Sequence, residues 1–260
     1  MRQTSRSLIG RIGLVAAIPL VAATAQERNA TGDARGRAVS EIRGVGGSVF
    51  RDEGLLRVYL TGPGVTDAAL GLLLPLEGGV GWLNLSRSKV TDGGLPRLAR
   101  LRSLEVLDLS RTAVTGTGLT HLRGLARLRH LELDGCRVDN IGLRALRPLT
   151  GLRFLGLSDT MIDDNGLEIV ASFGNLEGLD ISSRRITDAG LAHLKALKNL
   201  NWLSLTYSRT TDAGLAQLRA LPKLRYVILH DTLVTDRGIE NLRRAAPKLE
   251  VVYSTSKNAR

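Results

Sequence analysis

The chain has 260 residues, of which 43% are hydrophobic and 3% aromatic, and its formal net charge is +11. This length allows one or two globular domains with a substantial core, which must be mainly aliphatic. The single cysteine, Cys136, excludes an internal disulfide and a cysteine-rich zinc site, so stability must come from packing.

The first 25 residues have the pattern of a secretory signal peptide. Three arginines and no acid occur in residues 1–11, an apolar stretch follows over residues 12–25, and Ala23 and Ala25 give the small-x-small pattern of a cleavage site. The apolar stretch is shorter than the roughly 20 residues that an ordinary spanning helix needs. We therefore predict export to the periplasm or the cell exterior; the alternative is an uncleaved anchor or a disordered tail.

The next segments differ from the rest of the chain. Residues 26–37 are polar, which predicts a disordered linker. Residues 38–60 combine a short helical pattern, a glycine turn and one or two strand patterns, and we predict that residues 38–64 form an N-terminal cap.

From residue 65 the sequence repeats itself. The units are spaced by 24 residues, except for 25 in the first, and the last unit carries one extra residue. They begin at Val65, Val90, Val114, Val138, Ile162, Ile186, Thr210 and Val234. We predict eight repeats of 24–25 residues over residues 65–257, followed by a tail at residues 258–260.

Each unit contains one helical and one extended pattern. Leucines recur at three-residue intervals over residues 190–200, which suits the buried face of a short helix. Residues 200–205 then alternate, with Leu203 inward and Trp202 outward, as in a strand. Stacking such units predicts an α/β solenoid, or horseshoe, with a concave parallel β-sheet and short convex helices.

The repeats resemble a known family. "LRSLEVLDLSRTAV" (residues 101–114) and "LARLRHLELDGCRV" (residues 125–138) resemble the leucine-rich repeat L-x-x-L-x-L-x-x-N/C-x-L. The unit length and the recurring "VTDxGL" are similar to the ribonuclease-inhibitor-like and cysteine-containing subclasses, which occur in F-box adaptors and in exported bacterial proteins. The resemblance covers residues 57–253 and implies a binding scaffold. No F-box-like segment precedes the repeats, so an adaptor role is not expected.

In this family one position is usually Asn or Cys. Here it is filled by Ser88, Thr112, Cys136, Thr160, Arg184, Ser208 and Thr232. A small donor at this point can bond a backbone carbonyl, so we interpret Cys136 as structural and not as a reactive thiol. A charged side chain cannot take this role, so we expect Arg184 to turn outward and the fifth repeat to be locally irregular.

The motif "TDAG" recurs in register and is interpreted as structural. Thr or Asp precedes each predicted helix, where its side chain accepts from a free N–H, and the following Asp complements the helix dipole. The glycine two positions after this Asp permits close packing. The capping positions are Thr66, Thr91, Thr115, Asp139, Asp163, Thr187, Thr211 and Thr235. Eight copies in register argue against a catalytic or metal site.

The strand register predicts two outward columns on the concave face. The first is Arg57, Trp82, Val106, His130, Phe154, Gly178, Trp202, Tyr226 and Val251; the second is Tyr59, Asn84, Asp108, Glu132, Gly156, Asp180, Ser204, Ile228 and Tyr253. Exposed aromatics on such a face are typical of protein-binding surfaces, although aromatics also favour strands and shield the sheet. The predicted binding residues are Trp82, Asn84, Asp108, His130, Glu132, Phe154, Asp180, Trp202 and Tyr226, with the four larger aromatics as anchors and the acids setting charge preference.

These patterns favour a non-enzymatic scaffold that binds a protein or peptide, with no cofactor and no metal. The alternative is a structural envelope protein whose convex row of Arg123, Arg147, Lys195, Arg219 and Arg243 binds anionic cell-wall material. A more remote alternative is a hydrolase or metal protein that uses His130 with Glu132, Asp134 and Asp108. Nucleic acid is not an expected partner, because the basic row and the aromatics lie on opposite sides.

Overall fold

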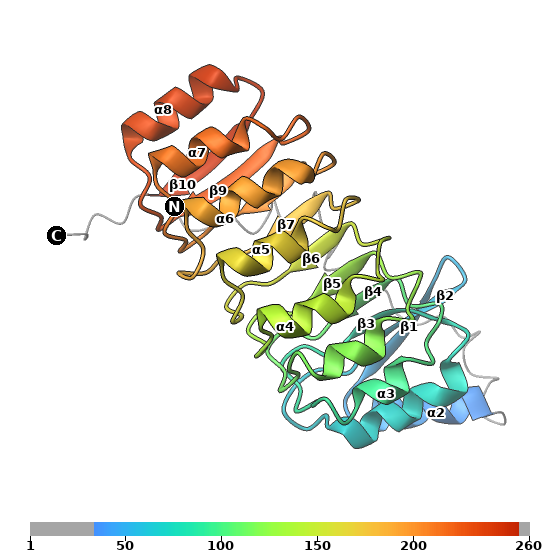
Figure 1. Ribbon diagram of the computed structural model, residues 1–260. Coiled ribbons are helices and arrows are strands. Elements are labelled where there is room, and N and C mark those ends of the chain that lie inside the picture. The colour runs from blue at the N-terminus through green and yellow to red at the C-terminus, as the bar shows by residue number, and fades with distance from the viewer. Residues whose placement is uncertain (1–33, 255–260) are drawn as a thin grey trace.

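The computed structural model describes residues 34–254. The predicted signal peptide, residues 26–33 of the predicted linker, and residues 255–260 at the end of the last repeat and in the tail lie outside the described residues. Within the described part the strands and helices alternate in chain order and stack into an elongated solenoid (Figure 1).

One ten-stranded sheet runs the length of the described chain, with its strands in sequence order. β1 pairs antiparallel with β2, and every later pair from β2 to β10 is parallel. The strands are β1 (Ser48–Asp52), β2 (Leu55–Tyr59), β3 (Val80–Asn84), β4 (Val106–Asp108), β5 (His130–Glu132), β6 (Phe154–Gly156), β7 (Gly178–Asp180), β8 (Trp202–Ser204), β9 (Tyr226–His230) and β10 (Glu250–Ser254).

Short helices form a second layer on one face of this sheet (Figure 1). The α-helices are α2 (Ala34–Gly44), α3 (Leu95–Leu98), α4 (Asn140–Leu143), α5 (Asp164–Val170), α6 (Asp188–Leu191), α7 (Asp212–Leu218) and α8 (Asp236–Ala245), and the 3-10 helices are η2 (Asp67–Leu76), η3 (Gly118–Leu122), η4 (Arg144–Leu146) and η5 (Ala192–Ala196). The α/β solenoid with a parallel sheet and short helices is therefore confirmed.

Helix α2 begins before the predicted cap. Residues 34–37, assigned to the linker from their polarity, are helical, because the chain continues to Ala38 and Ile42. These two residues lie one helical turn apart and are both buried, so the helix is held by the core that it covers.

The core lies between the sheet and the helices and is aliphatic. In each strand from β3 to β8 the residue before the last is a leucine with no exposed surface: Leu83, Leu107, Leu131, Leu155, Leu179 and Leu203. Burying one such side chain stabilises the fold by roughly 1.5–3 kcal/mol. The repeated column of leucines thus supplies a continuous core in which each unit packs on its neighbours.

The "TDAG" motif joins neighbouring repeats as well as capping helices. Thr187 accepts a hydrogen bond from the N–H of Ala189, which confirms the predicted cap at this position. At Thr66 the predicted cap is wrong, because its side chain makes no such bond. Thr187 also donates its own N–H (2.8 Å) and its hydroxyl (2.6 Å) to the two carboxylate oxygens of Asp164 in the preceding repeat. The same two-bond clamp joins Asp67 to Thr91, Asp92 to Thr115, Asp188 to Thr211 and Asp212 to Thr235.

The clamp explains why glycine follows. A Cβ placed on Gly190 would overlap Oδ1 of Asp164, and the equivalent Cβ on Gly214 would overlap Oδ1 of Asp188. The aspartate was expected to act on the dipole of its own helix. Its main contacts are instead the backbone N–H and hydroxyl of the next repeat.

Four of the small ladder residues have the predicted role. Thr112, Thr160 and Thr232 donate to backbone carbonyls three residues earlier, and the Cys136 thiol donates to the carbonyl of Leu109 at 3.0 Å. Cys136 is buried, which raises the pKa of its thiol. These contacts agree with a structural cysteine.

The fifth repeat is irregular at Arg184, as predicted. Arg184 is exposed, and its turn closes through Ile186 N–H to the carbonyl of Ser183. Six other repeats place a left-handed residue before the ladder position: Arg87, Arg111, Gly135, Asp159, Tyr207 and Asp231. Ser183, at the same position of the fifth repeat, does not adopt that conformation.

The predicted register is wrong in the last strand. Tyr226 pairs with Glu250 and Ile228 pairs with Val252, so Val251 and Tyr253 belong to the core-facing set. Val251 is buried, and Tyr253 packs against the core with the Arg243 guanidinium 5.4 Å from its ring centre. The extra residue of this repeat therefore lies before β10. It places Val251 and Tyr253 on the core side of the sheet and not on the outward side.

Candidate binding site on the concave face

All nine predicted binding residues lie in the two predicted columns. Strand pairing places Trp82, His130, Phe154, Trp202 and Tyr226 in the first column, and Asn84, Asp108, Glu132 and Asp180 in the second. The register from Arg57 to Tyr226 is therefore confirmed. We call this surface, the sheet face opposite the helices, the concave face.

Both tryptophans are buried, so the predicted exposure of these two anchors is wrong. Trp82 is 6% exposed and Trp202 is 3% exposed. Arg57 covers Trp82 with its guanidinium 4.5 Å from the ring centre. Phe154 lies 5.5 Å from Trp202, between ring centres, although a whole strand separates them. Side chains on a sheet face pack on one another and so remove most of the ring surface from water.

The contact between Phe154 and Trp202 is possible because a glycine lies between them. Gly178 of β7 lies between Phe154 and Trp202 in the first column, and a Cβ on Gly178 would meet Cδ2 of Phe154 at 2.5 Å. On its other side Phe154 stacks with His130, with ring centres 4.3 Å apart. His130, Phe154 and Trp202 thus form one continuous row of rings, and Phe154 and Tyr226 remain partly exposed.

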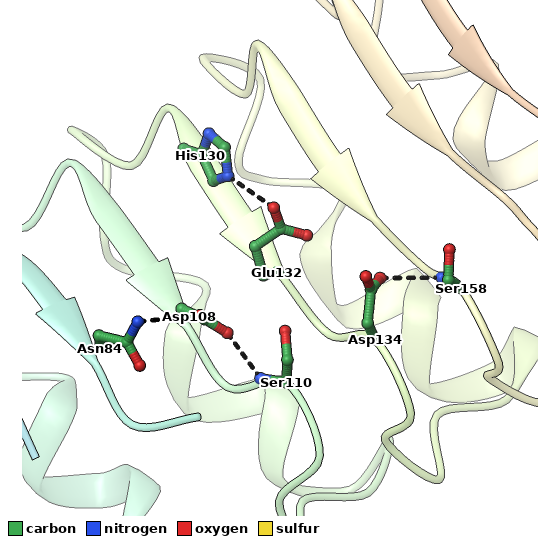
Figure 2. Close-up of polar contacts among 7 residues, drawn as sticks. All are labelled: Asn84, Asp108, Ser110, His130, Glu132, Asp134 and Ser158. Atoms are coloured by element: carbon green, nitrogen blue, oxygen red, sulfur yellow. Dashed lines mark hydrogen bonds and ion pairs between the residues drawn. The ribbon is translucent and has the colours of Figure 1, made fainter. Parts of the chain in front are cut away.

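Carboxylates gather beside this row. Figure 2 shows Asp108 on β4, Glu132 on β5 and Asp134 in the loop after β5. Asn84 donates to Asp108 (3.1 Å), and His130 is joined to Glu132 by a 2.9 Å contact. Asp134 accepts from the N–H of Ser158 at 2.9 Å. Gly156 leaves room for the group, since a Cβ there would overlap Glu132 and lie 2.9 Å from Oδ1 of Asp134.

Burial controls the charge of these groups. Burial raises the pKa of Glu132 well above its usual range, and the negative charges of Asp108 and Asp180 add to this effect. Burial, with the charges of Glu132, Asp180 and Asp108, raises the pKa of Asp134 to about 8. Burial lowers the pKa of His130 to about 4, against the influence of Asp108. With its pKa at about 4, His130 is uncharged at neutral pH, so its contact with Glu132 is a hydrogen bond and not an ion pair.

Three of the polar residues in the second column also shape the turns. Oδ1 of Asn84, Asp108 and Asp180 each accepts from the backbone N–H two residues later, at 2.8, 2.8 and 3.0 Å. Such Asx turns are a common use of Asn and Asp. These residues therefore have a structural role besides any role in binding, and the recurring "NLS", "DLS" and "DIS" were the sequence signal for it.

A pocket of about 290 Å³ opens on the concave face over β7, β8 and β9. It contains Asp180 and Trp202 from the predicted set, and Ser204 and Ile228 from the rest of the second column. Beyond the strand ends it adds hydroxyl, carboxyl and ring groups. The lining is Ser158, Asp159, Asp180, Ser182, Trp202, Ser204, Thr206, Tyr207, Ile228 and His230. Tyr207 is 50% exposed and gives this pocket a free aromatic surface.

The helix side differs in charge. Arg123, Arg147, Lys195, Arg219 and Arg243 are all exposed, and each lies in or directly after a convex helix. A separate open hollow of about 670 Å³ lies near Glu77 and is lined by Arg100, Arg102 and Arg127. Within residues 34–254 no group of three or more His, Cys, Asp or Glu side chains is arranged to hold a metal ion.

Comparison with known proteins agrees with this architecture. A family model described as "Leucine Rich repeat" matches residues 100–122 and 127–146. The solved structure of internalin C2 from Listeria monocytogenes str. 4b F2365 is 25% identical, with a TM-score of 0.52, and the match covers 75% of this chain and 78% of that one. The protein has the leucine-rich-repeat fold.

A solved structure of a TDR receptor shares this fold at 19% identity and a TM-score of 0.51. The match covers 76% of this chain but only 33% of the receptor chain, and it shows the fold alone. No curated protein matches the sequence. Within residues 34–254 no helix is long and apolar enough to cross a membrane.

Six of the ten residues that line the pocket lie outside the two columns, and sequence reasoning missed them. His230 is the last residue of β9, and the other five follow their strands: Ser158, Asp159, Ser182, Thr206 and Tyr207. Asp159 and Tyr207 adopt left-handed backbone at the turn, which points their side chains differently from a strand residue. Their recurrence at the position before the ladder residue was the available signal.

Proposed function

We propose that this protein is a non-enzymatic scaffold that binds a protein or peptide on its concave face. The pocket over β7, β8 and β9 carries the proposal, because it combines an exposed ring, partly buried polar groups and a hollow of about 290 Å³. Solenoid proteins use their concave surfaces for binding. Aromatic side chains beside a pocket are the usual anchors of such contacts.

The anchors that we propose differ from those expected from sequence. Tyr207 replaces Trp82, because Trp82 is covered by Arg57 and Tyr59. Trp202 lines the pocket, and the partly exposed Phe154 and Tyr226 are its neighbours in the first column. The remaining predicted residues, Asn84, Asp108, His130 and Glu132, form a polar surface beyond it.

A random peptide library tests this proposal. Peptides selected on the wild-type protein should bind at least about tenfold more weakly to Tyr207→Asn, since a truncated anchor typically costs more than 1 kcal/mol. Asparagine suits the left-handed backbone at this position (φ 62°), so the variant should fold.

The matched control is Ile141→Ala on helix α4, because Ile141 is 76% exposed on the helix side. Peptides that bind Tyr207→Asn and wild type equally, or that lose affinity for Ile141→Ala, would place binding elsewhere and contradict the proposal.

We also propose that the protein is exported and belongs with the ribonuclease-inhibitor-like or cysteine-containing type of repeat. The basic start, short apolar stretch and Ala-Thr-Ala end of residues 1–25 support export. The position of Cys136 in the ladder supports the subclass. N-terminal sequencing of protein from an envelope or secreted fraction should begin after Ala25; a mature chain that begins at Met1 would contradict export.

A second candidate function is binding of anionic envelope material through the helix side. The row of five exposed basic residues supports it, with the hollow near Arg127. Arg100 and Arg102 in that hollow are already bonded, to Glu77 and to the carbonyl of Gly124. Retention on an anionic matrix should fall steeply with salt and disappear when Arg123, Arg147 and Arg219 are changed to Glu; retention of that variant would remove this candidate.

A further inference from the structure

The pocket is acidic in a chain whose net charge is +11. Asp159 and Asp180 line it, and no Lys or Arg does. Asp134 and Glu132 lie near enough for the charge of Asp180 to act on both. None of the ion pairs described within residues 34–254 joins these four carboxyl groups to Lys or Arg.

Two residues that line the pocket have buried polar atoms without partners in the described structure. Nε1 of Trp202 and Oγ of Ser158 are buried and make no hydrogen bond in the described structure. Leaving a buried donor unpaired is unfavourable, so a ligand that supplies a hydrogen-bond acceptor would gain binding free energy. Nε1 of Trp82 is unpaired as well, but Trp82 lies outside this pocket and so provides an internal reference.

Asp180 has bonding capacity left for a ligand. Both of its hydrogen bonds, from the N–H and hydroxyl of Ser182, end on Oδ1. The second oxygen, Oδ2, has no partner in the described structure. The rings of Trp202 and Tyr207 line the same hollow, and aromatic faces attract cations.

We propose that the pocket takes the cationic end of an Arg or Lys side chain of the peptide ligand. This inference rests on the proposed function and adds the chemistry of the partner. Asp159 and Asp180 supply the countercharge, Oδ2 of Asp180 accepts from the guanidinium or ammonium, and Tyr207 covers it. A carbonyl of the same peptide segment would pair with the indole N–H of Trp202. An acidic side chain is excluded by the carboxylates.

The two tryptophans make a direct test possible. A ¹⁵N-labelled sample gives two indole N–H resonances, which the Trp82→Phe variant assigns. Titration with N-acetyl-arginine amide should shift the Trp202 resonance saturably and leave that of Trp82 in place. N-acetyl-citrulline amide has nearly the same shape without the charge and should bind about tenfold more weakly. No shift at Trp202, or equal binding of citrulline, would overturn the inference.

Two aspartates provide matched variants. Asp159 lines the pocket and Asp231 occupies the same turn position three repeats further along, with φ of 54° and 53°. Asp159→Asn should weaken the arginine probe severalfold, whereas Asp231→Asn should not. Asp180→Asn should weaken binding of the arginine probe by about tenfold. The turn should be kept, because Asn84 accepts the equivalent backbone hydrogen bond in its own repeat. Equal effects of Asp159→Asn and Asp231→Asn would point to general charge attraction and overturn the site.

The two proposals fail in different ways. Selected peptides that bind through Tyr207 but contain no basic residue would leave the proposed function in place and refute this inference. An arginine probe that binds the pocket while no peptide depends on Tyr207 would refute the scaffold role and keep the cation site.

Discussion

The surroundings of Asp134 favour its uncharged, protonated form. Burial and three neighbouring carboxylates raise its pKa from 3.8 to about 8, although the Ser158 N–H favours the charged form. Between about pH 4 and pH 8 the folded protein therefore keeps a proton that the unfolded chain has lost. Stability from this group is present at low pH and falls as the pH rises through that window.

We predict that Asp134→Asn removes this loss of stability at higher pH. Asparagine can still accept from Ser158 through its own Oδ1, but it carries no charge. The gain in unfolding free energy over wild type should grow from pH 4 to pH 8 and reach about 2 kcal/mol, less than the whole shift implies because the side chain is partly exposed. Urea unfolding at a series of pH values measures it.

His130 provides a contrast in the same experiment. Its pKa is lowered to about 4, so its contribution to stability rises between pH 4 and its ordinary value of 6.5. The effect is present in both proteins and cancels in their difference. A difference between Asp134→Asn and wild type that does not change with pH would show that Asp134 is charged in the folded protein.

The absence of a Cβ at Gly190 lets neighbouring repeats pack closely. A methyl group there would overlap Oδ1 of Asp164 and lie 2.9 Å from Cδ1 of Leu167. We predict that Gly190→Ala lowers the unfolding free energy by about 1–3 kcal/mol, because a well-packed site resists added volume. Gly174→Ala is the control, since its Cβ would meet nothing within 4 Å. Equal stability of the two variants in urea would contradict this explanation.

At the scale of elements, the Asp–Thr clamp joins the start of one helix to the start of the next. Because the two bonds from Thr187 reach Asp164 in the preceding repeat, the pair should act as a unit. A double-mutant cycle of Asp164→Ala and Thr187→Val should give a coupling energy of about 1 kcal/mol. Asp164 with the distant Thr235 should be additive, and a similar coupling in that pair would exclude a direct clamp.

The sequence predicted the elements that depend on its period. Helix, turn and strand recur with constant spacing, so counting from one unit placed Asp108 and Trp202 in the correct columns. Counting failed at β10, where the one added residue can be absorbed either in the loop or in the strand. Only packing decides between these, and Val251 is buried in the core-facing register.

Exposure was harder to predict than register. The burial of Trp202 depends on Phe154, two strands away, and on the missing side chain of Gly178 between them. Such contacts lie between repeats, and the period of one unit carries no information about them. The pocket was missed for a similar reason, because Tyr207 and Asp159 reach it from left-handed turns.

At the scale of the whole molecule, charge is divided between the faces. The concave face carries Asp108, Glu132 and Asp180, whereas the convex row from Arg123 to Arg243 is basic. A ligand with a basic segment would be attracted to one face and repelled from the other. The fold therefore gives an approaching partner an orientation before any specific contact forms.

The two ends of the array are covered differently. At the N-terminal end α2 and the antiparallel β1 close the core, so Ile42 and Val58 have no exposed surface. At the C-terminal end β10 has one neighbour, and Leu249 and Val251 are 9% and 7% exposed. In a solenoid each repeat is stabilised by its neighbours, so a poorly covered end opens at a lower free energy.

We therefore predict that amide hydrogen exchange is fastest at the C-terminal end. Protection should be highest in β4 to β7, lower in α8 and β10, and higher in β2 than in β10, because β2 is paired on both sides. Hydrogen-exchange mass spectrometry under native conditions measures this order. Replacing Val251 by Ala should extend the fast exchange to β9 and leave β2 unchanged, since the loss of buried surface is felt mainly by the adjacent repeat. Exchange that is uniform along the sheet would show instead that the array opens in one cooperative step.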